Sequence, residues 1–142
     1  MMNKEELMKI LPHRDNMLLV EEGYLDEEGK SHGFYTVKGD EFFLQGHFPG
    51  NPVVPGVILC EMMAQSSCLM FADQMQEGMT PMFTGLNEVK FKSPVKPGDT
   101  LESICVVDKA KPPFYWAKGT GYVNGKVALK AQFSFALVKG EK

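Results

Sequence analysis

The chain has 142 residues, of which 44% are hydrophobic and 23% are charged. This length and composition predict one globular domain spanning residues 1–142 and exclude a disordered chain. The 15 Lys and Arg residues and 18 Asp and Glu residues give a formal net charge of −3, which argues against general nucleic-acid binding. The first ten residues lack the apolar segment of a signal peptide, and no apolar run approaches the roughly 20 residues that span a membrane.

The three cysteines, Cys60, Cys68 and Cys105, form neither a CxxC motif nor a regular pattern. We therefore expect reduced thiols and a cytoplasmic location. The histidines and cysteines lack the spacing of metal ligands, and the glycine-rich motifs that bind nucleotides are absent. We accordingly expect no metal and no organic cofactor.

The N-terminal half predicts a short helix, two strands and a loop. Apolar residues at helical spacing place the helix over residues 3–11, where Pro12 ends it. Strands are expected over residues 18–25 and 33–38. Residues 46–56 contain three prolines and three glycines, so neither a helix nor a strand can continue through them.

Residues 57–76 contain neither Gly nor Pro and predict one long helix. Apolar side chains occupy nearly every face of it, which indicates burial in a core or an interface. The rest of the chain predicts four strands, over residues 83–91, 100–110, 114–123 and 126–138.

The last two of these strands flank Asn124-Gly125, a strong hairpin signal. The final strand alternates apolar and polar residues, as expected of a sheet with one buried face. We therefore predict an α+β fold in which an antiparallel sheet wraps around one long buried helix.

Glu61 is the first candidate functional residue, because it lies among apolar side chains early in the predicted helix. A carboxyl group in such surroundings favours its protonated form, as a general acid requires. Gln65 follows four residues later on the same helical face. The alternative is a structural Glu that is stabilised by the helix dipole.

His47 and Gly56 belong to the loop that leads into this helix. Histidine is the usual general base near neutral pH, although a lone loop histidine often only stabilises a turn. Gly56 lies at the helix start, where unpaired backbone N–H groups stabilise negative charge. Base, acid and anion-binding amide are therefore expected in one neighbourhood.

Three segments resemble one known family. Residues 47–65 resemble HFPxxPxxPGVxxxExxAQ, the active-site signature of the 3-hydroxyacyl-[acyl-carrier-protein] dehydratases of bacterial fatty-acid synthesis. Residues 11–20 resemble the LPHRxPxLLVD start of that family, and residues 91–101 its FxxPVxPGDxL segment. Two departures, Asn16 for the usual Pro and Glu21 for a frequent Asp, lie outside the signature.

The resemblance implies the hot-dog fold and a homodimer with active sites shared between subunits, commonly assembled as a trimer of dimers. One protomer would supply His47 and the other Glu61. The implied reaction is the dehydration of a (3R)-hydroxyacyl thioester to the trans-2-enoyl thioester. His47 would remove the α-proton, the Gly56 amide would bind the thioester oxygen, and Glu61 would protonate the departing hydroxyl.

The partner implied by the resemblance is the acyl carrier protein that carries the substrate. Because that protein is acidic, we consider Lys90, Lys92 and Lys96 for its docking, against the alternative of lysines that only protect a strand edge. Phe83 is a candidate gate of the apolar acyl tunnel. Cys60 is interpreted as a packing residue rather than a nucleophile.

Three other functions remain open. The enzyme could also isomerise the double bond to a cis-3-enoyl product, although Glu61 fits the branch that only dehydrates and Asp is usual in the other. A hot-dog thioesterase would hydrolyse the thioester. An acyl-chain-binding module would not need the side chains of His47 and Glu61.

Overall fold

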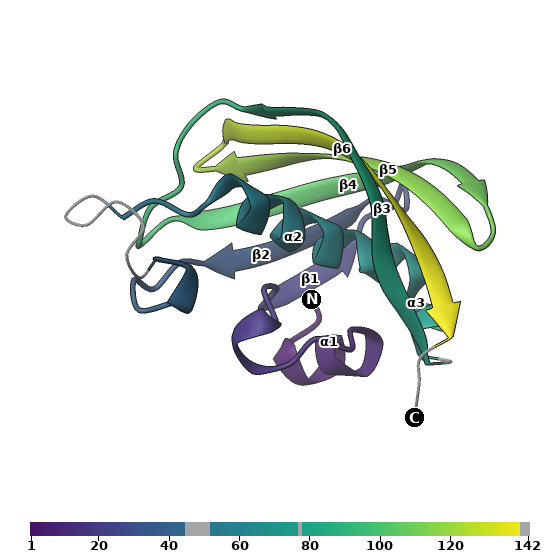
Figure 1. Ribbon diagram of the computed structural model, residues 1–142. Helices are drawn as coiled ribbons and strands as arrows, with labels where there is room; N and C mark the ends of the chain where they lie inside the picture. Colours follow the sequence, from purple (N-terminus) through teal and green to yellow (C-terminus); the bar gives the residue numbers. More distant parts are fainter. Residues whose placement is uncertain (45–51, 77, 140–142) are drawn as a thin grey trace.

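The computed structural model describes residues 1–44, 52–76 and 78–139 (Figure 1). The strands in these residues are β1 (Glu22–Leu25), β2 (Ser31–Thr36), β3 (Met79–Phe91), β4 (Thr100–Lys111), β5 (Phe114–Val123) and β6 (Lys126–Lys139). The α-helices are α1 (Lys4–Ile10), α2 (Gly56–Ser67) and α3 (Ala72–Gln76), and the 3-10 turns are η1 (Asp15–Met17), η2 (Phe42–Leu44) and η3 (Cys68–Phe71).

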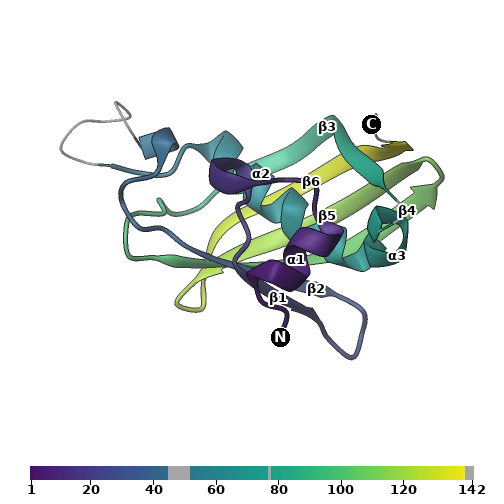
Figure 2. The same ribbon diagram turned by 90° about the horizontal axis from the view of Figure 1, so that it is seen from below.

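The strands form one sheet in the order β1-β2-β4-β5-β6-β3, and all neighbours are antiparallel. The sheet curves around α2, and α1 lies beside the C-terminal end of the helical layer, near α3 (Figures 1 and 2). Leu59, Met62 and Met63 of α2 are buried in the core that fills the space between helix and sheet. The predicted antiparallel sheet around a central helix is therefore confirmed.

The central helix differs from the single helix predicted over residues 57–76. It ends at Ser67 and is followed by the 3-10 turn η3 and the short helix α3. The Ser66 and Ser67 hydroxyls donate hydrogen bonds to the carbonyl oxygens of Met62 and Ala64, at 2.8 and 2.6 Å. Serine hydroxyls that compete for helix carbonyls in this way favour a local change of helical geometry. The prediction that this helix is buried on nearly every face is wrong for its first turn, where Val57 is 71% exposed.

The other elements follow the sequence closely. A capping box between Asn3 and Glu6 begins α1. Positive φ angles of 51° and 79° at Asn124 and Gly125 confirm the predicted hairpin between β5 and β6. The first strand is shorter than predicted, because the backbone N–H of buried Leu19 donates to the side chain of Gln65 instead of joining the sheet.

Strand β3 is an edge of the sheet and pairs only with β6 among the described strands. It is 13 residues long, yet most of it is exposed, including the apolar side chains of Met82, Phe83, Leu86 and Phe91. A long exposed edge strand with apolar side chains is a template for pairing with another chain.

At the opposite end of the sheet, His32 joins strands β2 and β4 and the turn after β1. Its Nδ1 lies 2.9 Å from Glu102 Oε2 and its Nε2 2.8 Å from Asp26 Oδ2, and its ring stacks on Tyr24. Burial alone lowers the pKa of His32, but the hydrogen bonds to Glu102 and Asp26 outweigh it and raise that pKa above the ordinary 6.5. The hydrogen bond from His32 lowers the pKa of Asp26 below its ordinary 3.8.

This cluster predicts a pH dependence of stability. Because folding raises the pKa of His32, the stabilisation of the folded state by this residue is fully present below pH 6.5. It is lost as the pH rises through the folded-state pKa. The stabilisation by Asp26, whose pKa is lowered, is instead lost as the pH falls below 3.8. We expect His32→Gln to lower the melting temperature more at about pH 5.5 than at about pH 8.5. Thermal melts of both proteins at the two pH values test this. An equal loss at both would contradict the charged His32 cluster.

Candidate active site

Glu61 lies in the middle of α2, and its side chain faces the segment that connects α1 to β1. Gln65 Nε2 donates a hydrogen bond of 2.9 Å to Glu61 Oε2, and His13 Nε2 lies 3.4 Å from the same oxygen. The Glu61 side chain is 22% exposed, so it is shielded from most of the solvent and still reachable by a ligand. Gln65 therefore lies on the same face of α2 as Glu61, as their spacing predicted.

Gln65 is the buried anchor of this site. Its Oε1 accepts the backbone N–H of Leu19 at 2.8 Å, and its Nε2 also donates to the carbonyl oxygen of Met17 at 2.8 Å. The side chain is 1% exposed, and these bonds satisfy its amide. Gln65 therefore fixes both the carboxyl group of Glu61 and the residues that precede β1.

His13 is a site residue that the sequence reasoning missed. It lies in the short loop after α1, which Arg14 holds by donating to the carbonyl oxygens of Leu11 at 2.7 Å and Met8 at 2.9 Å. The LPHR segment was visible in the sequence, but it is separated from Glu61 by 48 positions, so spacing alone did not bring the two together.

A cavity of about 80 Å³ lies beside Glu61. It is lined by His13, Glu61, Ala64, Gln65, Cys68, Pro81, Phe83 and Phe135. Phe83 is 43% exposed and packs edge-on against Phe133. This volume is well below the about 300–1,000 Å³ that small-ligand sites span. The described part of one chain thus supplies only part of a site for an acyl chain.

Gly56 lines a different cavity, of about 430 Å³, at the N-terminus of α2. Phe91 and Lys92 line it as well, and a Cβ added to Gly56 would lie 2.5 Å from the Phe91 ring. A methyl group cannot be accommodated at that distance without a shift of the ring. The two cavities have no lining residue in common, so Gly56 and Glu61 of one chain border separate cavities along α2.

The predicted base, His47, lies outside the described residues. The three cysteines are free and buried. Burial and the nearby Glu61 raise the pKa of Cys60, which opposes formation of a thiolate nucleophile. Among the described residues, no group of three or more His, Cys, Asp or Glu side chains is arranged to hold a metal ion.

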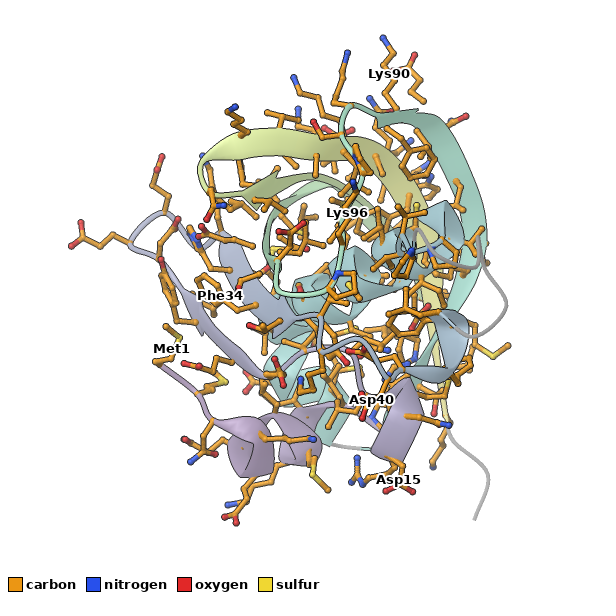
Figure 3. All side chains as sticks on the ribbon, turned by 90° about the vertical axis from the view of Figure 1, so that its left-hand side faces the viewer. Met1, Asp15, Phe34, Asp40, Lys90 and Lys96 are labelled. Atoms are coloured by element: carbon orange, nitrogen blue, oxygen red, sulfur yellow. The ribbon has the colours of Figure 1, made fainter. Side chains whose placement is uncertain are left out.

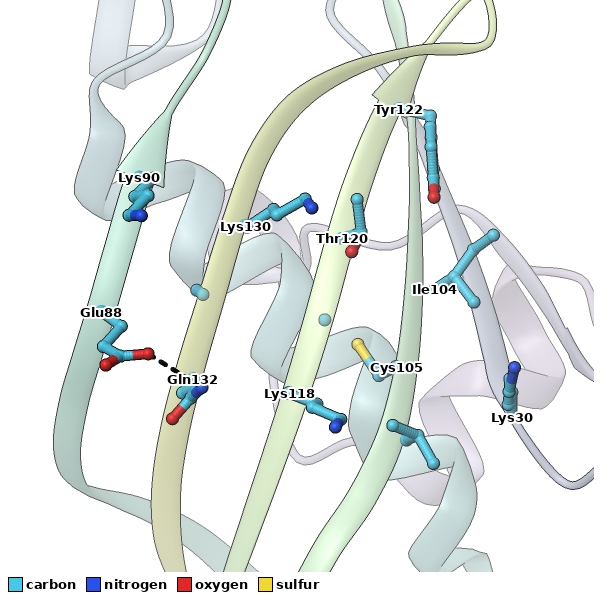
Figure 4. Close-up of a pocket in the computed structure, with 13 residues that line it drawn as sticks. Lys30, Glu88, Lys90, Ile104, Cys105, Lys118, Thr120, Tyr122, Lys130 and Gln132 are labelled. Atoms are coloured by element: carbon cyan, nitrogen blue, oxygen red, sulfur yellow. Dashed lines mark hydrogen bonds between the residues drawn. The ribbon is translucent and has the colours of Figure 1, made fainter.

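The lysines considered for docking occupy separate places. Lys90 lines a groove of about 420 Å³ on the outer face of the sheet, together with Lys118 and Lys130 (Figure 4). Glu88 in this groove accepts a hydrogen bond of 3.2 Å from Gln132. Lys90 projects from the outer side of the sheet, away from Lys96 (Figure 3). Only Lys92 of the three lines the cavity at Gly56.

Comparison with known proteins identifies the family. The FabA-like domain matches residues 11–132, which is most of the chain. The chain belongs to the FabA-like family. It is 39% identical over 141 residues to the 3-hydroxyacyl-[acyl-carrier-protein] dehydratase FabZ of Clostridium beijerinckii, covering 96% of this chain and 99% of that one. The FabZ of Caldicellulosiruptor saccharolyticus is 41% identical over 133 residues, covering 92% and 95% of the two chains.

Solved structures agree on the fold of this FabA-like chain. The dehydratase heterocomplex ApeI:P from Xenorhabdus doucetiae is 21% identical and superimposes with a TM-score of 0.79, covering 96% of this chain and 91% of that one. A protein from Helicobacter felis matches with a TM-score of 0.70 at 14% identity, covering 97% and 91%. The expected hot-dog fold is therefore confirmed.

Within the described residues, no helix has the length and apolar character needed to cross a membrane.

Proposed function

We propose that this chain, acting as one domain, is a dehydratase that converts (3R)-hydroxyacyl thioesters of the acyl carrier protein to trans-2-enoyl thioesters in fatty-acid elongation. The observation that carries the proposal is the carboxyl group of Glu61, held on a central helix at a cavity in a FabA-like chain. Relatives 39% and 41% identical, matched over nearly their full length, are named as dehydratases of this class.

The mechanism removes one water molecule in a balanced pair of proton transfers. His47 takes the α-proton, and the resulting negative charge moves onto the thioester oxygen, where the Gly56 N–H stabilises it. One preorganised donor of this kind is worth roughly 3 kcal/mol. The carbon–oxygen bond at C3 then breaks as Glu61 protonates the hydroxyl, the double bond forms, and water leaves. Transfer of a proton from His47 to Glu61 through solvent restores both groups.

We further propose that two chains share each site through β3. Phe83, in the first half of this strand, borders the Glu61 cavity, and Phe91, its last residue, borders the Gly56 cavity. Antiparallel pairing of β3 with its copy about a twofold axis near Asn87 would place each Phe83 opposite the partner's Phe91. The Glu61 cavity of one chain would then adjoin the Gly56 cavity of the other. The trimer of dimers remains a prediction.

Two further roles belong to this proposal. Phe83 gates the acyl tunnel, as its exposed ring at the mouth of the Glu61 cavity suggests. Lys92 docks the acidic carrier protein, because it lies beside the cavity at Gly56, where the thioester would enter. The cytoplasmic location also remains a prediction.

The first test is product analysis with a purified 3-hydroxyacyl carrier protein. We expect wild-type protein to yield the trans-2-enoyl thioester and, in the reverse direction, to hydrate it. Accumulation of cis-3-enoyl thioester would identify the isomerising branch. Release of free carrier-protein thiol would instead identify a thioesterase, and absence of turnover by folded protein would refute the enzymatic proposal.

A further inference from the structure

Two side chains approach the same oxygen atom of Glu61. Gln65 Nε2 donates to Oε2 at 2.9 Å, and His13 Nε2 lies 3.4 Å from Oε2. The orientation of the Gln65 amide is fixed by its own partners, because its oxygen must accept the N–H of Leu19. Its nitrogen therefore has to face Glu61.

The other ring nitrogen determines the tautomer of His13. Nδ1 is buried and has no hydrogen-bond partner among the described residues. A proton on Nδ1 would leave a buried N–H group without a partner among the described residues, whereas Nε2 lies 3.4 Å from the carboxyl oxygen of Glu61. Of the two tautomers, the one with its proton on Nε2 fits this environment better.

Hydrogen bonds within its own loop hold the backbone around His13. Pro12 precedes it, and the guanidinium group of Arg14 donates to the carbonyl oxygens of Leu11 and His13, both at 2.7 Å. The imidazole is thus presented to Glu61 by a braced loop, while Glu61 itself is presented by α2. A contact between two separately held groups is suited to orienting a carboxyl group.

We propose that His13 is a positioning residue that, together with Gln65, makes Oε2 the accepting oxygen of Glu61 and leaves Oε1 to carry the transferable proton. As this proton leaves Oε1, negative charge develops on the carboxylate, and the two N–H donors stabilise it. The inference rests on the proposed function, in which Glu61 is the acid. His13 does not exchange a proton with the substrate.

The charged and titratable surroundings of His13 are few. Glu61 and Cys68 face the cavity from the helical segment, and Arg14 belongs to the loop of His13. Strands β3 and β6 contribute the uncharged Pro81, Phe83 and Phe135. Among the described residues, Glu61 is therefore the carboxyl group that a replacement of His13 affects directly, and the effect is looked for in the alkaline limb of the pH profile.

Three variants test the inference. His13→Leu removes the donor, whereas His13→Gln can place an amide N–H near the position of Nε2. His32→Gln is the matched control, because it removes a histidine from the opposite end of the sheet. We expect His13→Leu to lower kcat by about 10- to 100-fold, the range of one hydrogen bond to a charged group, with KM changed less than about twofold.

The pH profile separates positioning from a structural role. His13→Leu removes the N–H donor to Glu61 and so favours the protonated form of that side chain. The alkaline limb of the kcat/KM pH profile should therefore move to higher pH in His13→Leu. In His13→Gln, which restores a donor, the limb should return to its wild-type position. The control should retain the wild-type limb. Equal losses in both His13 variants, or an unmoved limb in His13→Leu, would overturn the inference. Circular dichroism verifies that each variant is folded.

A second measurement does not depend on turnover. Infrared difference spectra between each protein and its Glu61→Gln counterpart isolate the carboxylate stretch of Glu61. We expect that band to shift in His13→Leu and to stay in place in His32→Gln. Wild-type protein that dehydrates no thioester would refute the proposed function. The band would then still report whether His13 holds Glu61, and an unshifted band would refute that contact.

Discussion

Glu61→Gln is expected to lower kcat for dehydration by about 10²- to 10⁴-fold, the usual contribution of a general acid. The amide preserves the size of the side chain but cannot give a proton to the departing hydroxyl. Steady-state assay of the 3-hydroxyacyl carrier protein measures the loss. Glu28→Gln is the matched control and should retain wild-type activity, because the exposed Glu28 side chain contacts only Lys30, at 3.8 Å, among the described charged groups.

The same variant tests whether sites are shared. His47→Ala and Glu61→Gln chains, each nearly inactive, should regain activity when co-expressed. With random pairing, half of the dimers combine the two variants, and each of these has one site with both residues intact. About one quarter of the wild-type activity is then expected. Activity no greater than that of the two variants alone would place His47 and Glu61 of the same chain in each site.

Gln65→Leu is expected to lower the free energy of unfolding by about 3 kcal/mol, because it leaves one buried and one partly buried backbone group without partners. The N–H of Leu19 and the carbonyl oxygen of Met17 both lose their bond to Gln65. Urea denaturation measures the change. Glu61 also loses its closer N–H donor, so kcat should fall in parallel.

Gln132→Leu provides the comparison for this experiment. Gln132 is exposed on the outer face of the sheet and donates only to Glu88, at 3.2 Å. Its replacement should change stability by less than about 0.5 kcal/mol. Similar losses in the two Gln variants would mean that the hydrogen bonds of Gln65 contribute little to the fold.

Local patterns in the sequence predicted most of the architecture. Alternation and the Asn124-Gly125 turn defined the β5–β6 hairpin, because strand periodicity and turn geometry are properties of neighbouring residues. The break after Ser67 was not predicted, because it depends on which carbonyl groups the serine hydroxyls bond. Residue type alone does not determine that choice.

The candidate site was predictable to the extent that it is local. Glu61 and Gln65 are four residues apart on one helix, and their contact followed from helical geometry. His13 reaches Glu61 only through the tertiary fold, with the loop after α1 held against α2. The separation of Gly56 from Glu61 into two cavities likewise depends on how β3 runs past the helix.

The length of β3 constrains how this chain can change in evolution. In the proposed dimer, pairing of β3 with its copy would make the spacing between the two cavities a property of one strand, which already contains irregularities between Phe83 and Gly85 and between Asn87 and Lys90 in its pairing with β6. An insertion or deletion of one residue there would displace both half-sites of a dimer at once. Exposed loops tolerate length variation, but this exposed strand should not.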